Sequence, residues 1–315
     1  MKKYVLQRCL WLIVVLLCVG FLIFTVMYFV PGKPADVLLT AEATAQEKYE
    51  FNQKLGVNDP YIVQLGRYMY NTFIKFDFGT SYVYRVPVLQ ELNNRVPRTL
   101  TLGTIAIVIN AFIGIPLGVA CAMHQNKPLD HLLMILAMAG ISMPDFWLAL
   151  MMILLFSVKL KWLPPFGIGS WQNWIMPVIA CSVQGVAVNA RQTRSAVLET
   201  IRADFVTTAR AKGVPEHDVI YKHMLPNALI PVINMLGGAF GRAIAGTVVI
   251  ETVFSFPGVG VYMMNGINGR DYPVVRGCVL VLAAFSAVAV LIVDLIYGFI
   301  DPRIKAQYEG GGAHK

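Results

Sequence analysis

The chain has 315 residues, of which 57% are hydrophobic and 14% are charged, and its formal net charge is +8. Soluble domains carry about 25% charged residues, so the composition excludes an ordinary soluble protein. The apolar residues fall in blocks of roughly 20, the length that crosses a bilayer as a helix, which predicts an all-α polytopic membrane protein. The positive charge is typical of cytoplasmic loops; no basic, aromatic-bearing module points to nucleic acid.

The first apolar block runs from Cys9 to Val30 and follows the bases Lys2, Lys3 and Arg8. It is longer than the roughly 7–15 residues of a signal-peptide core, and no A-x-A cleavage site follows it. We therefore expect an uncleaved first membrane helix. The polar stretch that follows, to Pro97, carries amphipathic patterns around residues 43–55 and 61–76 and is expected outside the cytoplasm.

Apolar length and helix breakers predict five further spans, which makes six transmembrane helices in all. The five cover about residues 99–123, 132–158, 175–197, 228–249 and 273–300. We expect an N-terminal helix with its extracytoplasmic segment over 1–97, a permease-like helical domain over 98–300, and a cytoplasmic tail over 301–315. The short loops on the side of the termini hold thirteen Lys and Arg residues, against four on the other side. This excess predicts that both termini and the loop at about 199–226 are cytoplasmic.

The segment from Arg202 to Asn227 is the longest charge-dense stretch after residue 100. Gly213 breaks a first helical pattern, Pro215 can start a second, and Pro226 is expected to end it. The pattern therefore predicts a helix, a glycine turn and a second helix outside the membrane, where a soluble partner docks.

Sequence motifs for catalysis are missing. There is no G-x-x-x-x-G-K-[ST] loop for ATP, no H-E-x-x-H, and no G-x-S-x-G. The five histidines are scattered and the five cysteines form no C-x-x-C pair, so no metal site is indicated. We expect a non-catalytic chain without a cofactor of its own.

The run Thr208-Ala-Arg-Ala-Lys-Gly213, nine residues, then His223-Met-Leu-Pro226, resembles the EAA loop of ABC importer permeases. The resemblance implies a type I ABC importer permease fold, in which this segment forms coupling helices that fit a groove on a cytoplasmic ATPase. Thr207 stands where the broad family has an acid. The peptide-type branch of the family typically has no acid at this position either. The coupling residues so implied are Asp204, Thr208, Ala209, Arg210, Lys212, Gly213, Leu225 and Pro226.

Further motifs narrow the resemblance to the dipeptide, oligopeptide and nickel permease family, and to the first of its two paired permeases. They include Phe29-Val-Pro-Gly-Lys-Pro34, Asp77-Phe-Gly-Thr-Ser81, Ser142-Met-Pro-Asp-Phe-Trp147, Glu251-Thr-Val-Phe-Ser-Phe-Pro-Gly-Val-Gly260 and Arg270-Asp-Tyr-Pro-Val274. The resemblance implies a binding-protein-dependent importer of di- or oligopeptides in a bacterial plasma (inner) membrane.

The same resemblance implies the partners. They are a second homologous permease, two cytoplasmic ABC ATPases that bind ATP and Mg²⁺, an extracytoplasmic substrate-binding protein, and the surrounding membrane lipid. Nickel, a metal chelate or glutathione are alternative substrates. The loop Lys159–Trp174 and the run Ala187-Val-Asn-Ala-Arg191 also resemble nickel-type members.

A few residues are candidates for a translocation path or gate. A charge inside a membrane costs at least about 2.5 kcal/mol, so Asp145, Arg242 and Asp294 should face the path, a partner helix or the interface. Glu251, Phe254 and Pro257 lie in a run read either as an outer gate or as a plain loop. A stand-alone secondary transporter would need embedded carboxylates such as Asp294 and Asp145; a membrane-bound enzyme lacks any catalytic constellation.

The spacings Gly114-x-x-x-Gly118 and Gly237-x-x-x-Gly241 predict faces of small residues on which another helix packs closely.

Overall fold

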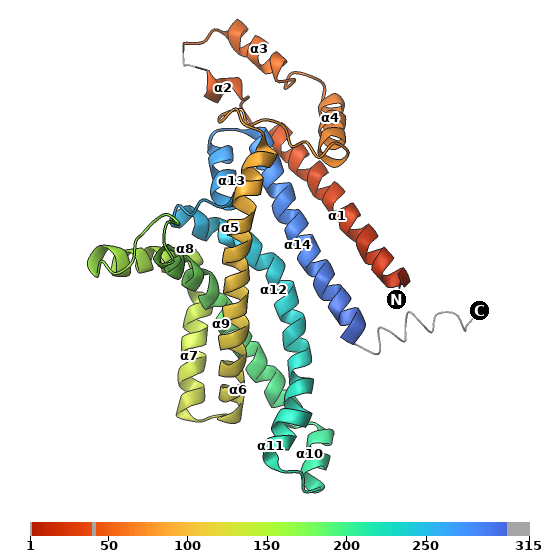
Figure 1. The fold of residues 1–315 in the computed structure, drawn as a ribbon, viewed down its shortest axis with the longest axis vertical. Coiled ribbons are helices and arrows are strands. Elements are labelled where there is room, and N and C mark those ends of the chain that lie inside the picture. The colour runs from red at the N-terminus through yellow and green to blue at the C-terminus, as the bar shows by residue number, and fades with distance from the viewer. Residues whose placement is uncertain (1, 40–41, 301–315) are drawn as a thin grey trace, which may run out of the picture. The chain divides into compact units, whose positions relative to one another are not determined.

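The computed structural model describes residues 2–39 and 42–300, and this part of the chain is helical (Figure 1). The expected tail at 301–315 lies outside the described residues. The first helices are α1 (Lys2–Phe29), α2 (Ala35–Leu38), α3 (Ala45–Lys54), α4 (Tyr61–Phe73), α5 (Val88–Ile109), the π-helix η1 (Asn110–Gly114), α6 (Ile115–Met123), α7 (Pro128–Ser142), α8 (Asp145–Met152) and the π-helix η2 (Ile153–Lys159). They are followed by α9 (Gln172–Thr200), α10 (Asp204–Ala211), α11 (Glu216–Asp218), the π-helix η3 (Val219–Met224), α12 (Leu225–Val253), α13 (Val259–Asn268) and α14 (Tyr272–Ile300).

Several of these helices are long and apolar enough to cross a bilayer. Among the described residues they are Tyr4–Phe29, Val88–Met123 and Tyr272–Val293, with the bent pair α7–α8 as a fourth if it is counted as one span. Helices α9 and α12 have 29 residues each, which is about 43 Å at 1.5 Å per residue. The predicted class, an all-α multi-pass membrane protein, is confirmed.

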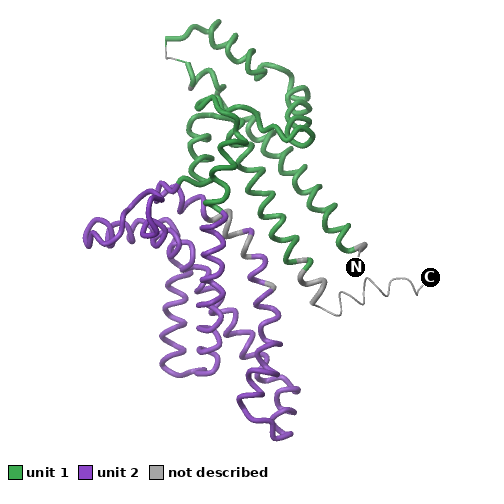
Figure 2. Tube along the Cα trace, viewed as in Figure 1, with its two compact units in different colours: residues 1–99, 257–315 green, residues 100–256 purple. Residues whose placement is uncertain are grey.

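The chain divides into two compact units, which Figure 2 colours separately. Unit 1 combines residues 1–99 with 257–315, and unit 2 is the continuous stretch 100–256. Each unit has buried apolar clusters of its own.

In unit 1, α1 packs along α14 and against α4, and α13 packs on α14. The buried side chains Val88 and Leu92 meet Tyr262 of α13 and Cys278 of α14. This burial explains why α5 begins at Val88, well before the expected start of the second span at about 99. Pro97 lies inside the helix and cannot donate a backbone hydrogen bond, but the packed turn before it keeps its helical form.

Three distant segments of unit 1 meet at residues 270–272, with the buried carboxylate of Asp271 between Arg270 and Tyr272. Asp271 accepts hydrogen bonds from Ser81 Oγ at 2.5 Å and from the backbone N–H groups of Tyr82 and Val83 at 3.1 Å each. On either side of it, Arg270 donates to the carbonyl of Pro31, and the Tyr272 hydroxyl donates to the carbonyl of Gly32 at 2.7 Å. Three of the motifs noted in the sequence therefore meet at one place.

In unit 2, α9 is the central helix and packs against α6, α7, α8 and α12. The predicted small-residue face at Gly114 and Gly118 is confirmed, because both glycines lie directly against α9. A Cβ on Gly118 would stand 2.5 Å from the carbonyl oxygen of Ala190, and one on Gly114 would stand 2.9 Å from that of Val186. Only glycine allows this approach of the two backbones.

The expected span over 132–158 is not one straight helix but a bent pair of helices, α7 and α8. The chain bends by 100° between α7 and α8. Met143 is extended (φ −80°, ψ 125°) because the ring of Pro144 disfavours helical geometry in the residue before it. Asp145 thus begins a new helix.

Replacing Gly118 by Ala should lower the thermal unfolding midpoint of the purified protein. The added methyl group meets backbone atoms that cannot move aside, and overpacking of this kind costs about 1–3 kcal/mol. Gly66→Ala on α4 is the matched control, since nothing lies within 4 Å of a Cβ there. The control should be neutral or slightly stabilising; an unchanged midpoint for Gly118→Ala would contradict the close packing.

Candidate functional site

The charge-dense segment folds into a compact hairpin of α10, α11 and η3, the hairpin of residues 204–224. A buried apolar cluster mounts it on the ends of two long helices. Val206 of α10 and Val219 and Met224 of η3 pack with Ala122 of α6 and Val197 of α9, and all of them are buried. The hairpin is therefore held against the rest of unit 2 by side-chain packing as well as by its connections along the chain.

Gly213 makes the turn of the hairpin. Its φ is +76°, a conformation that L-residues with a side chain rarely adopt, and no atom lies within 4 Å of where a Cβ would stand. The N–H of Gly213 donates to the carbonyl of Arg210 at 3.0 Å, and that of Val214 donates to Ala209 at 3.3 Å. This is the Schellman pattern that ends many helices. Glycine is required here by the backbone and not by lack of space.

One ion pair joins the two arms of the hairpin, and a second lies within the second arm. Arg210 donates to both carboxylate oxygens of Glu216, from Nε at 3.1 Å and Nη2 at 2.6 Å, and Lys222 pairs with Asp218 at 2.9 Å. The Arg210 hydrogen bonds hold the pKa of Glu216 below its ordinary value. The pair is thus intact above the usual glutamate range and is lost as the pH falls through the lowered pKa. Arg210 is engaged within its own chain, while Lys212 is exposed.

The outward face of α10 carries an aromatic residue that the sequence reasoning missed. Phe205 is 45% exposed, and Thr208 and Lys212 follow it at helical spacing, all exposed. The neighbouring Val206 is fully buried. Successive side chains of a helix point about 100° apart, so only one of the neighbours Phe205 and Val206 can face the buried cluster. Two adjacent large apolar residues in the sequence therefore indicated that one of them is exposed.

The second arm does not end at Pro226, as had been expected. From Glu216 the chain is helical through η3 and continues as α12 to Val253. Leu225 packs against the buried cluster, and Pro226 lies in the first turn of α12, where a missing N–H is tolerated. The side chain of Asn227 donates to the His223 carbonyl at 2.6 Å. All eight predicted coupling residues lie on this hairpin or at its junction with α12.

Three of the predicted path residues in unit 2 have described side chains: Asp145, Glu251 and Phe254. Asp145 is in the first turn of α8, and Glu251, expected in a loop, is inside α12 and fully buried. Both carboxylates lie near Cys181 of α9. Phe254 directly follows α12 and is buried in an apolar core with Phe256. The ring of Phe256 packs edge-on against that of Trp174, with 4.8 Å between the ring centroids.

The remaining predicted path residues are Pro257, Arg242 and Asp294. Pro257 belongs to unit 1, where its carbonyl accepts a hydrogen bond from Arg98 at 3.1 Å. The break in the fifth span at this run is confirmed, since α12 ends at Val253 and α13 starts at Val259. The side chains of Arg242 and Asp294 lie outside the part of the chain that the structure describes.

Several membrane-crossing helices and a glycine-turn hairpin mounted at the end of a helical unit define a membrane transport subunit. The chain belongs to the family described as "Binding-protein-dependent transport system inner membrane component", whose sequence model matches residues 114–306. The N-terminal model of the same transport systems matches residues 1–103.

Curated relatives match over nearly the whole chain. The dipeptide transport system permease protein DppB of Alkalihalophilus pseudofirmus is 38% identical, over 97% of this chain and 100% of its own length. The glutathione transport system permease protein GsiC is 40% identical in Salmonella paratyphi A and 38% identical in Escherichia coli K12, each over 97% of this chain and 99% of the relative. An amino acid ABC transporter of known structure, 15% identical, aligns over 68% of this chain and 94% of its own with a TM-score of 0.53, which supports the fold.

These matches identify the chain as a non-catalytic permease subunit of an ABC importer of the peptide family. It is a multi-pass protein of the inner membrane that works with an ATPase and a substrate-binding protein. A stand-alone secondary transporter and a membrane-bound enzyme are thereby set aside.

Replacing Gly213 by Val should loosen the hairpin. A side chain in the left-handed region costs about 1–2 kcal/mol, and a β-branched residue fits there worst. Amide hydrogen exchange over residues 204–224 should become faster. Gly213→Asn is the matched control, since asparagine tolerates this conformation, and its exchange should stay close to wild type. Equal exchange in all three proteins would show that the turn does not hold the hairpin.

Proposed function

We propose that the hairpin of residues 204–224 is where a cytoplasmic ATPase docks and moves this permease. The observation that carries the proposal is the unbroken helical run from Glu216 through η3 into α12. A displacement of the hairpin is passed directly to a helix 29 residues long, with no flexible loop between them.

The docking face follows from what is buried and what is exposed. Val206, Val219 and Met224 are used to mount the hairpin, and Arg210 is paired with Glu216. This leaves Phe205, Thr208 and Lys212 along one exposed face of α10. An aromatic residue beside a cation is a common anchor at protein interfaces, because it buries a large apolar area with few rotatable bonds. Asp204, Ala209, Gly213, Leu225 and Pro226 shape and support this face.

The proposed assembly contains this chain, a second homologous permease, two ATPases and one substrate-binding protein. The chain has no phosphate-binding loop, so ATP and Mg²⁺ belong to the ATPases. Both termini and the hairpin lie in the cytoplasm, on the side that carries the excess of Lys and Arg. The chain crosses the membrane six times when α9 and α12 are counted with the apolar spans and the bent pair.

Within unit 2, Asp145 and Glu251 are the described carboxylates proposed to line or gate the path. They come from different helices, and both lie near Cys181 of α9. Helix α12, which starts at the hairpin, carries Glu251 and ends at Val253, directly before Phe254. Motion at the hairpin would therefore act on the buried end of the helix that holds one of the two carboxylates. Arg242, Asp294 and Pro257 remain further candidates.

The proposed substrates are di- or oligopeptides, supported by the similarity to a dipeptide permease. Glutathione is the second candidate, supported by similarity of the same extent to glutathione permeases. Nickel or a metal chelate is a possibility at the level of the wider family alone.

Phe205→Ala should weaken binding of the ATPase to the permease by about tenfold or more, as for the loss of an interface anchor. Substrate-stimulated ATP hydrolysis by the reconstituted complex should fall with it. Tyr49→Ala on α3 is the matched control, because that ring is also about half exposed but lies far from the hairpin in the sequence. Unchanged binding and hydrolysis in Phe205→Ala would rule out this docking face.

The substrate is tested on the cognate substrate-binding protein by calorimetry against dipeptides, longer peptides, glutathione and Ni²⁺ chelates. We expect micromolar or tighter binding of peptides and no heat from Ni²⁺ chelates. Tight binding of glutathione alone would replace the peptide assignment, and binding of a chelate alone would overturn both.

A further inference from the structure

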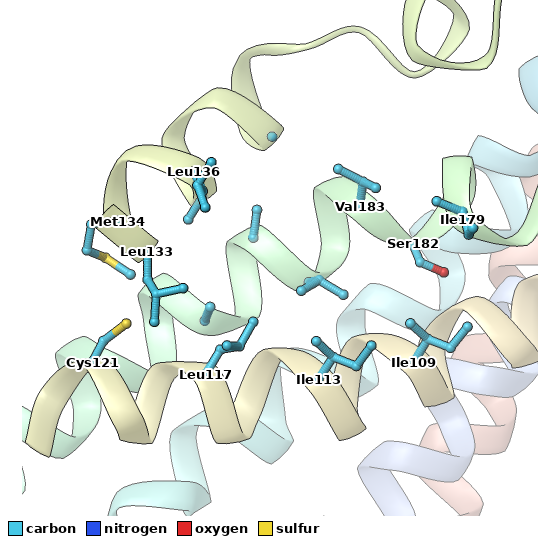
Figure 3. A pocket seen from close by; sticks show the side chains of 15 residues that line it. Ile109, Ile113, Leu117, Cys121, Leu133, Met134, Leu136, Ile179, Ser182 and Val183 are labelled. Atoms are coloured by element: carbon cyan, nitrogen blue, oxygen red, sulfur yellow. The ribbon is translucent and has the colours of Figure 1, made fainter. Parts of the chain in front are cut away.

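An apolar groove runs along unit 2 between α5–α6, α7 and α9, with a volume of about 350 Å³ (Figure 3). Ile113 and Leu117 line one wall, Leu133 and Leu136 of α7 a second, and Ile179 and Val183 of α9 the third. Some of these side chains are well exposed, Leu136 at 58% and Ile113 at 47%. The groove is therefore open along its side.

The lining suits hydrocarbon and not a peptide. Among the lining residues, all of which the structure describes, Ser182 carries the one hydroxyl group, and it donates to the Val178 carbonyl at 2.6 Å. A peptide would find no free hydrogen-bonding partner there. An engineered apolar cavity of about 150 Å³ holds one benzene, so this groove holds a considerably longer apolar group. Two of its walls, α5–α6 and α7, belong to candidate membrane spans, where such a group is supplied by lipid.

One end of the groove is charged. The lining face of α9 continues one turn beyond Ala190 to Arg194, and that of α7 extends one turn before Leu133 to Asp130. Arg194 donates from Nε and Nη2 to the two carboxylate oxygens of Asp130, at 2.7 Å each. Asp130 is buried, but Arg194 is 24% exposed, and its Nη1 takes no part in these bonds.

Two further bases lie within one turn of this pair. Lys127 precedes α7 and Arg191 follows Ala190, and both are exposed with no ion pair among the described residues. Together with Arg194 they outnumber the single acid Asp130, so this end of the groove is positive. In the orientation proposed above it faces the cytoplasmic leaflet, whose lipids carry negative charge.

We propose that this groove binds one acyl chain of an anionic phospholipid, whose phosphate lies at Arg194 Nη1, Lys127 and Arg191. Hydrocarbon gains nothing by leaving the bilayer for an apolar groove, because both are equally apolar. Selectivity must therefore come from the charged end. The groove favours phosphatidylglycerol over phosphatidylcholine with the same chains.

The test is native mass spectrometry of the assembled transporter with equal amounts of the two lipids. We expect retention of phosphatidylglycerol, and a loss of roughly tenfold in the double variant Lys127→Gln/Arg191→Gln. Lys159→Gln/Lys161→Gln is the matched control, with two exposed lysines that lie outside the groove, and should retain the lipid. Equal retention of both lipids, or equal loss in both double variants, overturns the proposal.

A second pair of variants tests the groove itself. Ala137→Phe fills it from α7, whereas Leu132→Phe enlarges an exposed residue of the same helix outside the lining. The first should lose phosphatidylglycerol and the second should keep it. If the isolated chain retains the lipid and the assembled transporter does not, the partner permease covers the groove and the proposal fails.

The proposal rests on the proposed orientation, which is checked separately. A cysteine introduced by Lys127→Cys should react with a membrane-impermeant maleimide only in inside-out vesicles. Reaction from the outside overturns the cytoplasmic assignment and this lipid site with it. Normal peptide-stimulated ATP hydrolysis together with no lipid preference overturns the lipid site alone.

Discussion

The close contact between α6 and α9 is the constraint on which unit 2 depends. Inside a membrane, apolar side chains gain little by leaving lipid, so helices associate through close packing and polar contacts. Gly114 and Gly118 bring the two backbones near enough for this. Because α9 also contacts α7, α8 and α12, its position fixes the walls of the groove, the surroundings of Asp145 and Glu251, and the mount of the hairpin.

The hairpin has one side that is firmly packed against the rest of unit 2 and another side that is exposed. Its fixed side is made of buried apolar residues such as Val206 and Met224, and its turn requires a glycine. Its charged pairs are solvent-exposed, where such pairs contribute little to stability. A segment that transmits motion needs the firmly packed side, and a segment that recognises a particular partner needs the exposed side. In this chain the buried mount and the proposed docking face lie on different faces of α10.

The sequence alone was sufficient for the class of protein, the first and last membrane helices, and the glycine turn. These depend on local patterns: apolar length, charge in loops, and the one residue type that accepts φ near +76°. It was misleading where distant contacts decide. The start of α5 at Val88 depends on burial against α13 and α14. Pro226 was a second, local exception, because it lies in the first turn of α12 and does not end a helix there. The roles of Phe205 and Asp130 needed the packed structure, because only burial separates an exposed aromatic residue from a core one.

The buried carboxylate of Asp271 has a consequence for the order in which the chain is built. Ser81 and Asp271 are 190 residues apart, and the N–H groups of Tyr82 and Val83 have this carboxylate as their acceptor. At about 5–20 residues per second, a ribosome needs roughly 10–40 s to make the stretch between them. Residues 100–256 emerge in that interval and form one continuous unit. Unit 2 can therefore assemble during synthesis, whereas unit 1 has to wait for the end of translation to join its two halves.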